Sequence, residues 1–155
     1  MSSKETIYKK IEKFMGDYYK AYNQYGQDAE TIDKMDQYWA PEFKAIAYFP
    51  VLEFPTMDLV TWKKFIVGSH MSVLERINLD ELYVDTKEMA VTSKVNIDNI
   101  DRKTNELLLK VDSLALYNLK VDKKMNIKII SLKFFCADPV GLMELFGMIP
   151  TKTVK

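Results

Sequence analysis

The feature that most constrains this chain is a set of four long alternating segments in its second half. They cover about 73–85, 88–99, 106–121 and 126–136. Apolar and polar residues alternate along each segment, which predicts β-strands with one face against a core. Short polar links, such as the one from Asp122 to Lys124, separate the segments as hairpin turns do. We therefore expect the second half to be a meander of long antiparallel strands.

The first half carries the period of helices instead. Ser2 and Glu5 fit a capping box at the start of an amphipathic stripe. The stripe predicts a helix over about 3–24 and consists of Ile7, Ile11, Phe14, Tyr18, Tyr22 and Tyr25. Shorter helices are expected at about 29–39, 57–70 and 140–148, with a short strand at 43–49.

Helices followed by a run of long strands indicate an α+β fold in a single domain spanning residues 1–155. The predicted strands exceed the usual length of ~5–6 residues, so the sheet should twist and curl strongly. We expect the N-terminal helices to pack on the concave face of a strongly curved antiparallel sheet. A cone-shaped molecule of this kind encloses an apolar hollow that suits a small ligand.

The composition excludes several classes of function. The chain has 22 basic and 22 acidic residues, one cysteine and one histidine. A formal net charge of zero leaves no basic field to attract nucleic acid. A single histidine and a single cysteine cannot form the usual zinc sites, so we expect no metal and no cofactor. No apolar run approaches the ~20 residues of a membrane helix, so we expect no membrane contact and a cytoplasmic protein.

The order of predicted elements resembles the nuclear-transport-factor-2-like superfamily, which includes ketosteroid isomerase, scytalone dehydratase and SnoaL-like polyketide cyclases. Three stretches, 18–23, 111–116 and 129–134, are similar to ketosteroid isomerase in detail. In that family a helical tyrosine and a protonated aspartic acid donate hydrogen bonds to the substrate oxyanion. Tyr18 and Asp112 fall at these two positions. The resemblance therefore implies that Tyr18 and Asp112 are the catalytic pair.

One position departs from the family pattern. The family's general base is an aspartate followed by Pro-Val, and here Phe49 precedes Pro50 and Val51. A phenylalanine cannot abstract a proton, so the usual base is missing. Glu53 could replace it if its loop folds inward. His70, at the end of the third predicted helix, is either a residue favoured by the helix dipole or a general acid or base at the pocket mouth.

Two arguments disagree about the face of the sheet that Asp112 occupies. Counting apolar residues makes the face with Val111 and Tyr117 the better core, which leaves Asp112 outside. The resemblance places Asp112 inside with Leu114 and Leu116, where burial would keep the acid protonated. We carry the inward orientation forward as the prediction. On the last strand, the apolar face expected to line the hollow consists of Ile130, Leu132, Phe134 and Cys136.

The sequence thus predicts a pocket for a small apolar molecule that bears one oxygen. The ligand-binding residues expected beside the catalytic pair are Tyr22, Phe49, Trp62, His70, Leu114, Leu132 and Phe134. If the protein is an enzyme, the resemblance implies an isomerase, dehydratase or cyclase acting on a carbonyl compound. The alternative is a non-catalytic ligand-binding or protein-interaction module of the same fold. In either case we expect a homodimer through the outer face of the sheet.

Overall fold

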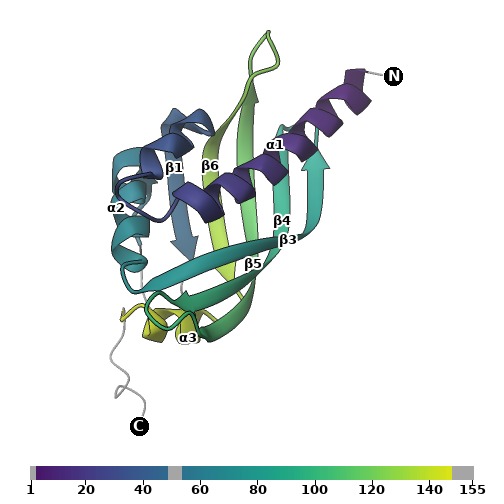
Figure 1. Cartoon of the computed structure of the whole chain (residues 1–155). Coiled ribbons are helices and arrows are strands. Elements are labelled where there is room, and N and C mark those ends of the chain that lie inside the picture. The colour runs from purple at the N-terminus through teal and green to yellow at the C-terminus, as the bar shows by residue number, and fades with distance from the viewer. Residues whose placement is uncertain (1–2, 49–53, 148–155) are drawn as a thin grey trace.

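The computed structural model describes residues 3–48 and 54–147 (Figure 1). It begins with one long helix, α1 (Ser3–Tyr25), and a 3-10 turn, η1 (Ile32–Gln37). The remaining elements, in chain order, are β1 (Trp39–Tyr48), β2 (Met57–Asp58), α2 (Leu59–Ser69), β3 (Val73–Asp85), β4 (Ala90–Asp101), β5 (Leu107–Val121), β6 (Ile127–Cys136) and α3 (Pro139–Leu145). The four long strands and the helix over 3–24 are confirmed to within two residues at each end.

The strands form one curved sheet in the order β2-β1-β6-β5-β4-β3. Neighbouring strands run antiparallel except β1 and β6, which pair in parallel. The sheet is therefore mostly antiparallel, as expected, and contains one parallel pair. Because no hairpin joins β1 to β6, the chain is free to bring them together in either direction.

α1 crosses the concave face of the sheet, with α2 beside it and α3 at one end (Figure 1). The inward stripe of α1 includes Ile11, Met15, Tyr18 and Tyr22, all of them buried. The expected α+β architecture, with a helix packed on a strongly curved sheet, is thus confirmed. The helix expected over 29–39 is shorter than predicted. It is limited to the six-residue 3-10 helix η1, and Trp39 already begins strand β1.

Each of the three hairpins between β3 and β6 starts with an aspartate that organises the turn. The carboxylates of Asp85, Asp101 and Asp122 each accept hydrogen bonds from two backbone N–H groups two to four residues further on. Each of these three turns also places one residue in the left-handed backbone region, namely Met89, Asn105 and Met125. Aspartate at the first position of a turn is favoured because its side chain can replace a backbone acceptor in this way.

A bulge changes which residues of β6 face the core. Asn118 pairs with Ser131, whereas the next residue of β5, Leu119, pairs with Ile129. Ile130 is the extra residue and lies partly buried at the shift. Ile129 therefore faces inward before the bulge, while Leu132 and Phe134 face inward after it. The expectation that Ile130 shares a face with Leu132 is wrong for this reason.

Candidate functional site

An internal cavity of about 70 Å³ lies between the helices and the concave face of the sheet. A water molecule needs a cavity volume of roughly 10–15 Å³, so this cavity has room for a small molecule or several waters. Most of its lining is aromatic, from Tyr18, Tyr19, Tyr22, Trp62, Phe65, Tyr117, Phe134 and Phe146. Two charged side chains, Glu75 and His70, also face it.

Glu75 and His70 form a buried pair at the cavity. His70 Nε2 lies 3.0 Å from Glu75 Oε1, and the two side chains are 6% and 9% exposed. The contact is close enough for an ion pair, although it lacks the alignment of a hydrogen bond. Tyr22, from α1, donates its hydroxyl to the same Glu75 oxygen at 2.8 Å. Three elements, α1, the end of α2 and β3, therefore meet at one carboxylate.

The surroundings of the imidazole show which protons it carries. His70 Nδ1 lies 2.7 Å from the carbonyl oxygen of Ile66, which can only accept, so Nδ1 carries a proton. Nε2 faces a carboxylate oxygen, which also accepts. A ring with acceptors at both nitrogens is best matched by the doubly protonated imidazolium.

Electrostatics agrees with this assignment. Burial disfavours the charged ring, but the Glu75 carboxylate outweighs it, and the pKa of His70 is raised. Burial likewise acts against the Glu75 carboxylate, but His70 and the Tyr22 hydroxyl outweigh it, and the pKa of Glu75 is lowered. Burial raises the pKa of Tyr22 well above its ordinary value, so this hydroxyl stays neutral and donates. The pair is therefore an ionised carboxylate beside an imidazolium.

The second carboxylate oxygen of Glu75 is not held by the described part of the protein. Tyr22 and His70 both address Oε1. Within residues 3–48 and 54–147, no hydrogen-bond partner is found for Oε2 of Glu75. Glu75 thus presents one oxygen that is held by the protein and one that can contact a ligand.

Side chains behind the site hold its backbone in place. The Gln27 amide makes two hydrogen bonds to the backbone of Glu75, at 2.6 and 2.7 Å. Four residues earlier on α1, Asn23 does the same to Ile77, at 2.8 and 2.9 Å. Arg102 donates from Nε to the carbonyl oxygen of His70 at 2.7 Å. These contacts fix the edge strand β3 and the end of α2, and with them the two charged groups.

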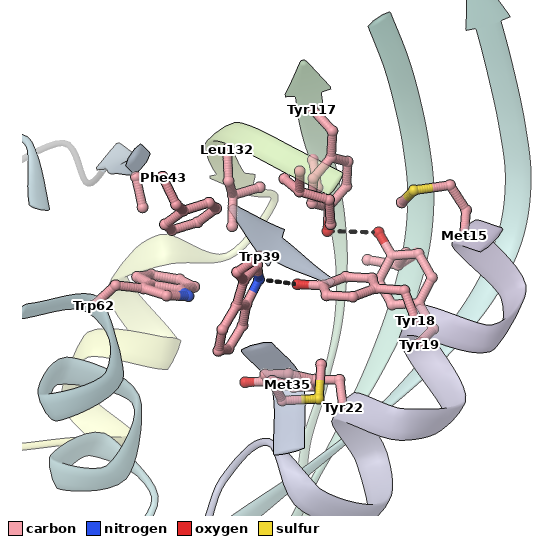
Figure 2. Packing of buried hydrophobic residues seen from close by; sticks show 14 of the residues in the cluster. Met15, Tyr18, Tyr19, Tyr22, Met35, Trp39, Phe43, Trp62, Tyr117 and Leu132 are labelled. Carbon is pink, nitrogen blue, oxygen red and sulfur yellow. Dashed lines mark hydrogen bonds between the residues drawn. The ribbon is translucent and has the colours of Figure 1, made fainter. Parts of the chain in front are cut away.

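Tyrosine hydroxyls form a second polar group in the cavity (Figure 2). The Tyr19 and Tyr117 hydroxyls lie 2.8 Å apart, and the Trp39 indole N–H donates to the Tyr18 hydroxyl at 3.3 Å. Because Tyr18 accepts from Trp39, its own proton is left for another acceptor. Burial raises the pKa of Tyr18 and raises that of Tyr19 to about 12, so both hydroxyls remain neutral donors.

Six of the site residues predicted from the sequence lie at this cavity. They are Tyr18, Tyr22, Trp62, His70, Leu132 and Phe134. Phe49 and Glu53 lie outside the described residues. His70 does end α2, as its position in the sequence indicated, and its backbone N–H caps the helix. Its ring turns inward to Glu75 rather than toward solvent.

The prediction that Asp112 and Leu114 face the cavity is wrong. Both side chains lie on the outer face of the sheet, where Leu114 is 45% exposed and Asp112 accepts a hydrogen bond from Asn96. The inward residues of β5 are the alternate ones, including Val111, Ser113 and Tyr117. The apolar count along the strand indicated the correct face, and the family resemblance indicated the other one. Asp112 therefore cannot donate to a ligand in the cavity.

Glu75 is the residue of this candidate site that the sequence pattern did not predict. It stands on the inward face of β3 between Val73 and Ile77, which are core positions. An acidic residue at an inward position of an alternating strand was the available signal. The sequence pattern does not show which residues contact Glu75, because Tyr22 lies 53 residues earlier in the chain.

Comparison with solved structures identifies the architecture. A candidate SnoaL-like polyketide cyclase from Jannaschia sp. CCS1 has a TM-score of 0.66 at 12% identity, covering 97% of this chain and 98% of that chain. A candidate isomerase from Bacillus subtilis has a TM-score of 0.64 at 11% identity, covering 91% and 95%. An NTF-2-like protein of unknown function from Pseudomonas aeruginosa has a TM-score of 0.60 at 12% identity, covering 83% and 98%. This chain has the nuclear-transport-factor-2-like fold.

The nuclear-transport-factor-2-like fold is shared at identities that carry no activity from one protein to another. No protein-family model matches the sequence, and no curated protein sequence matches it either. Among the described residues, no group of three or more histidine, cysteine or acidic side chains could hold a metal ion. Nor does that part of the chain contain a helix long and apolar enough to cross a bilayer.

Proposed function

We propose that the cavity binds a small, mostly apolar carbonyl compound and that Glu75 removes a proton from the carbon next to the carbonyl group. The observation that carries this proposal is a buried, ionised carboxylate that lines an aromatic cavity and has one oxygen held by Tyr22. Ionised carboxylates act as general bases in this kind of proton transfer. Glu75 would thereby supply the base that Phe49 does not.

The other side chains support the same reaction. As the C–H bond breaks, its electron pair forms an enolate and the negative charge moves to the carbonyl oxygen. The Tyr18 hydroxyl, whose proton is not used by Trp39, is suited to donate to that oxygen. Return of the proton from Glu75 to a different carbon gives an isomerase, and attack of the enolate carbon on a second carbonyl gives a cyclase.

A proton-exchange experiment tests this proposal without knowledge of the natural substrate. We expect the wild-type protein to accelerate deuterium exchange at the carbon next to the carbonyl of 1-tetralone in D₂O, followed by proton NMR. Glu75→Gln should lower the catalysed rate by about 10²–10⁴-fold, the usual contribution of a positioned base. Asp112→Asn is the matched control, because it removes a carboxylate on the outer face, and it should leave the rate unchanged.

Two results would contradict the proposal. One is a folded Glu75→Gln protein that exchanges 1-tetralone as fast as the wild type. The other is wild-type protein that binds 1-tetralone without accelerating exchange, which would favour the non-catalytic ligand-binding alternative.

The outer face of the sheet supports a second role, as a homodimer interface. Tyr48, Phe135 and Leu114 are cross-strand neighbours on β1, β6 and β5, and all three are exposed. The Tyr48 and Phe135 rings stack at 4.5 Å between centroids. We propose that a second copy of the chain covers this row, because apolar side chains that gather on a sheet face gain from burial.

A further inference from the structure

The indole N–H of Trp62 is a buried donor that the protein does not satisfy. Trp62 lies on α2, lines the cavity and is 8% exposed. Its Nε1 finds no hydrogen-bond partner among the residues that the structure describes. Trp39, the other tryptophan of the chain, differs in this respect, because its indole N–H donates to Tyr18 (Figure 2). The indole N–H of Trp39 therefore has an acceptor, whereas that of Trp62 has none among the described residues.

An unoccupied buried donor favours any ligand that brings an acceptor to it. Leaving a polar group buried without a partner is unfavourable, and a ligand oxygen placed there removes the penalty. The Trp62 ring is held in one orientation by Phe65, stacked at 5.9 Å, and by Phe43, at 6.1 Å. The indole nitrogen is on the edge of the ring that faces Trp39, toward the interior (Figure 2). The donor is therefore fixed in direction before any ligand arrives.

Trp62 and the Glu75 site lie at opposite ends of α2. His70, which contacts Glu75, closes the C-terminal end of the helix, and Trp62 lies in its first half. Eight residues at ~1.5 Å per residue place the backbones of Trp62 and His70 about 12 Å apart. A ligand that reaches both ends must be about as long as two fused rings.

We propose that the ligand of this cavity carries a second oxygen, which accepts a hydrogen bond from the Trp62 indole while the carbonyl end lies near Glu75. The ligand class is then a compact, mainly apolar cyclic compound with a carbonyl group and a further hydroxyl, carbonyl or ether oxygen at the far end. The placement of the carbonyl end rests on the proposed function of Glu75. The donor role of Trp62 rests on its own burial and lack of a partner.

Indole NMR signals of the wild-type protein provide a direct test. The chain has only two tryptophans, and the variants Trp62→Phe and Trp39→Phe each leave one indole N–H signal for assignment. Three compounds of nearly the same shape serve as probes: tetralin, 1-tetralone and 6-hydroxy-1-tetralone, with no, one and two oxygens. In 6-hydroxy-1-tetralone the hydroxyl is on the second ring, at the far end from the carbonyl group. We expect 6-hydroxy-1-tetralone to shift the Trp62 indole proton downfield, tetralin not to do so, and the Trp39 signal to stay in place.

Affinity gives a second readout that does not depend on tryptophan signals. By calorimetry, 6-hydroxy-1-tetralone should bind the wild type about three- to tenfold more tightly than 1-tetralone, the usual value of one neutral hydrogen bond. Trp62→Phe retains an aromatic ring but lacks the donor, so this preference should disappear. Tetralin should bind both proteins within about twofold, which controls for packing.

The outcomes separate this inference from the proposed function. A Trp62 signal that stays in place at saturation, or that moves equally with tetralin, overturns the donor role, as does a preference that survives Trp62→Phe. These results are independent of the proton-exchange assay that tests Glu75. Conversely, wild-type protein that shows the Trp62 shift but does not accelerate proton exchange overturns the catalytic role of Glu75 alone. If none of the three compounds binds at millimolar concentration, both proposals fall.

Discussion

Replacing Glu75 with glutamine removes the charge from the buried pair and keeps the shape of the side chain. At the observed 3.0 Å between Glu75 Oε1 and His70 Nε2, and an effective dielectric constant of about 20, two unit charges attract by about 5.5 kcal/mol. Desolvation offsets much of this, since both side chains are more than nine-tenths buried. Removing one partner of such a pair destabilises a protein by about 3–5 kcal/mol when the other partner keeps its charge.

The loss of stability in Glu75→Gln depends on pH because His70 can release its proton. In the wild type the raised pKa of His70 means that its stabilisation is fully present below the ordinary value of 6.5 and is lost as the pH rises through the folded-state pKa. The lowered pKa of Glu75 sets the acid limit: its stabilisation is present above the ordinary 4.5 and is lost as the pH falls through the folded-state pKa. Between these limits the pair contributes in full.

In Glu75→Gln the carboxylate no longer raises the pKa of His70. Burial and Arg102, which lower this pKa, then outweigh the Ile66 carbonyl, which raises it, so the pKa of His70 falls below its ordinary value. The unfolded variant then binds more protons than the folded one at acid pH. Its free energy of unfolding should therefore increase as the pH rises toward about 6.5, by at most about 1.4 kcal/mol per pH unit. We expect a deficit of about 3–5 kcal/mol near pH 5 that shrinks to about 1–2 kcal/mol near pH 7.5. At the higher pH His70 is neutral in the variant, and the remaining loss arises because the Tyr22 hydroxyl donates to an uncharged amide oxygen instead of a carboxylate.

Urea unfolding of both proteins at these two pH values measures the deficit. Because the chain has one histidine, the titration of a single imidazole signal by NMR reports the pKa of His70 directly. Asp112→Asn, on the exposed outer face, should change stability by no more than about 0.5 kcal/mol at either pH. An equal deficit for Glu75→Gln at both pH values, or a pKa of His70 that does not fall, would refute the reasoning about the ion pair.

Two further predictions concern Arg102 and the outer face. The positive charge of Arg102 lowers the pKa of His70. Arg102→Gln should therefore raise the pKa of His70 in the same NMR titration. An unchanged or lower pKa would contradict this effect of Arg102. Leu114→Lys places a charge beside Phe135 on the outer face and should convert the homodimer to a monomer, as measured by light scattering, with little change in monomer stability. A wild-type protein that is already monomeric, or a variant that stays dimeric, would contradict the proposed interface.

Local chemistry explains why much of the fold was predictable. The alternation along 107–121 and the aspartates at the starts of the hairpins act within one or two strands, so the sequence pattern shows them directly. The helical stripe of α1 is equally local. The length of the 3-10 helix at Ile32–Gln37 was harder to predict, because apolar spacing alone does not distinguish a short helix from a longer one.

The site was predictable only in part. Tyr18, Tyr22 and Trp62 lie on inward helical stripes, so periodicity could place them at the core. The alternation of apolar residues along β5 correctly placed Asp112 on the outer face. The resemblance of short stretches to ketosteroid isomerase placed it inside, because a shift of one residue moves a strand side chain to the opposite face.

The sequence by itself determined the strands, the hairpins, the long helix and the apolar character of the hollow, since each follows from a repeat or a turn within a short stretch of chain. Only the tertiary structure decided the chemistry of the site. Glu75 becomes an ionised, partly free carboxylate because Tyr22 and His70 approach it from two other elements. Likewise, Trp62 becomes an unoccupied donor because the surrounding described residues offer it rings rather than oxygens. Burial and pairing between distant residues are properties of the packed chain, and no local pattern encodes them.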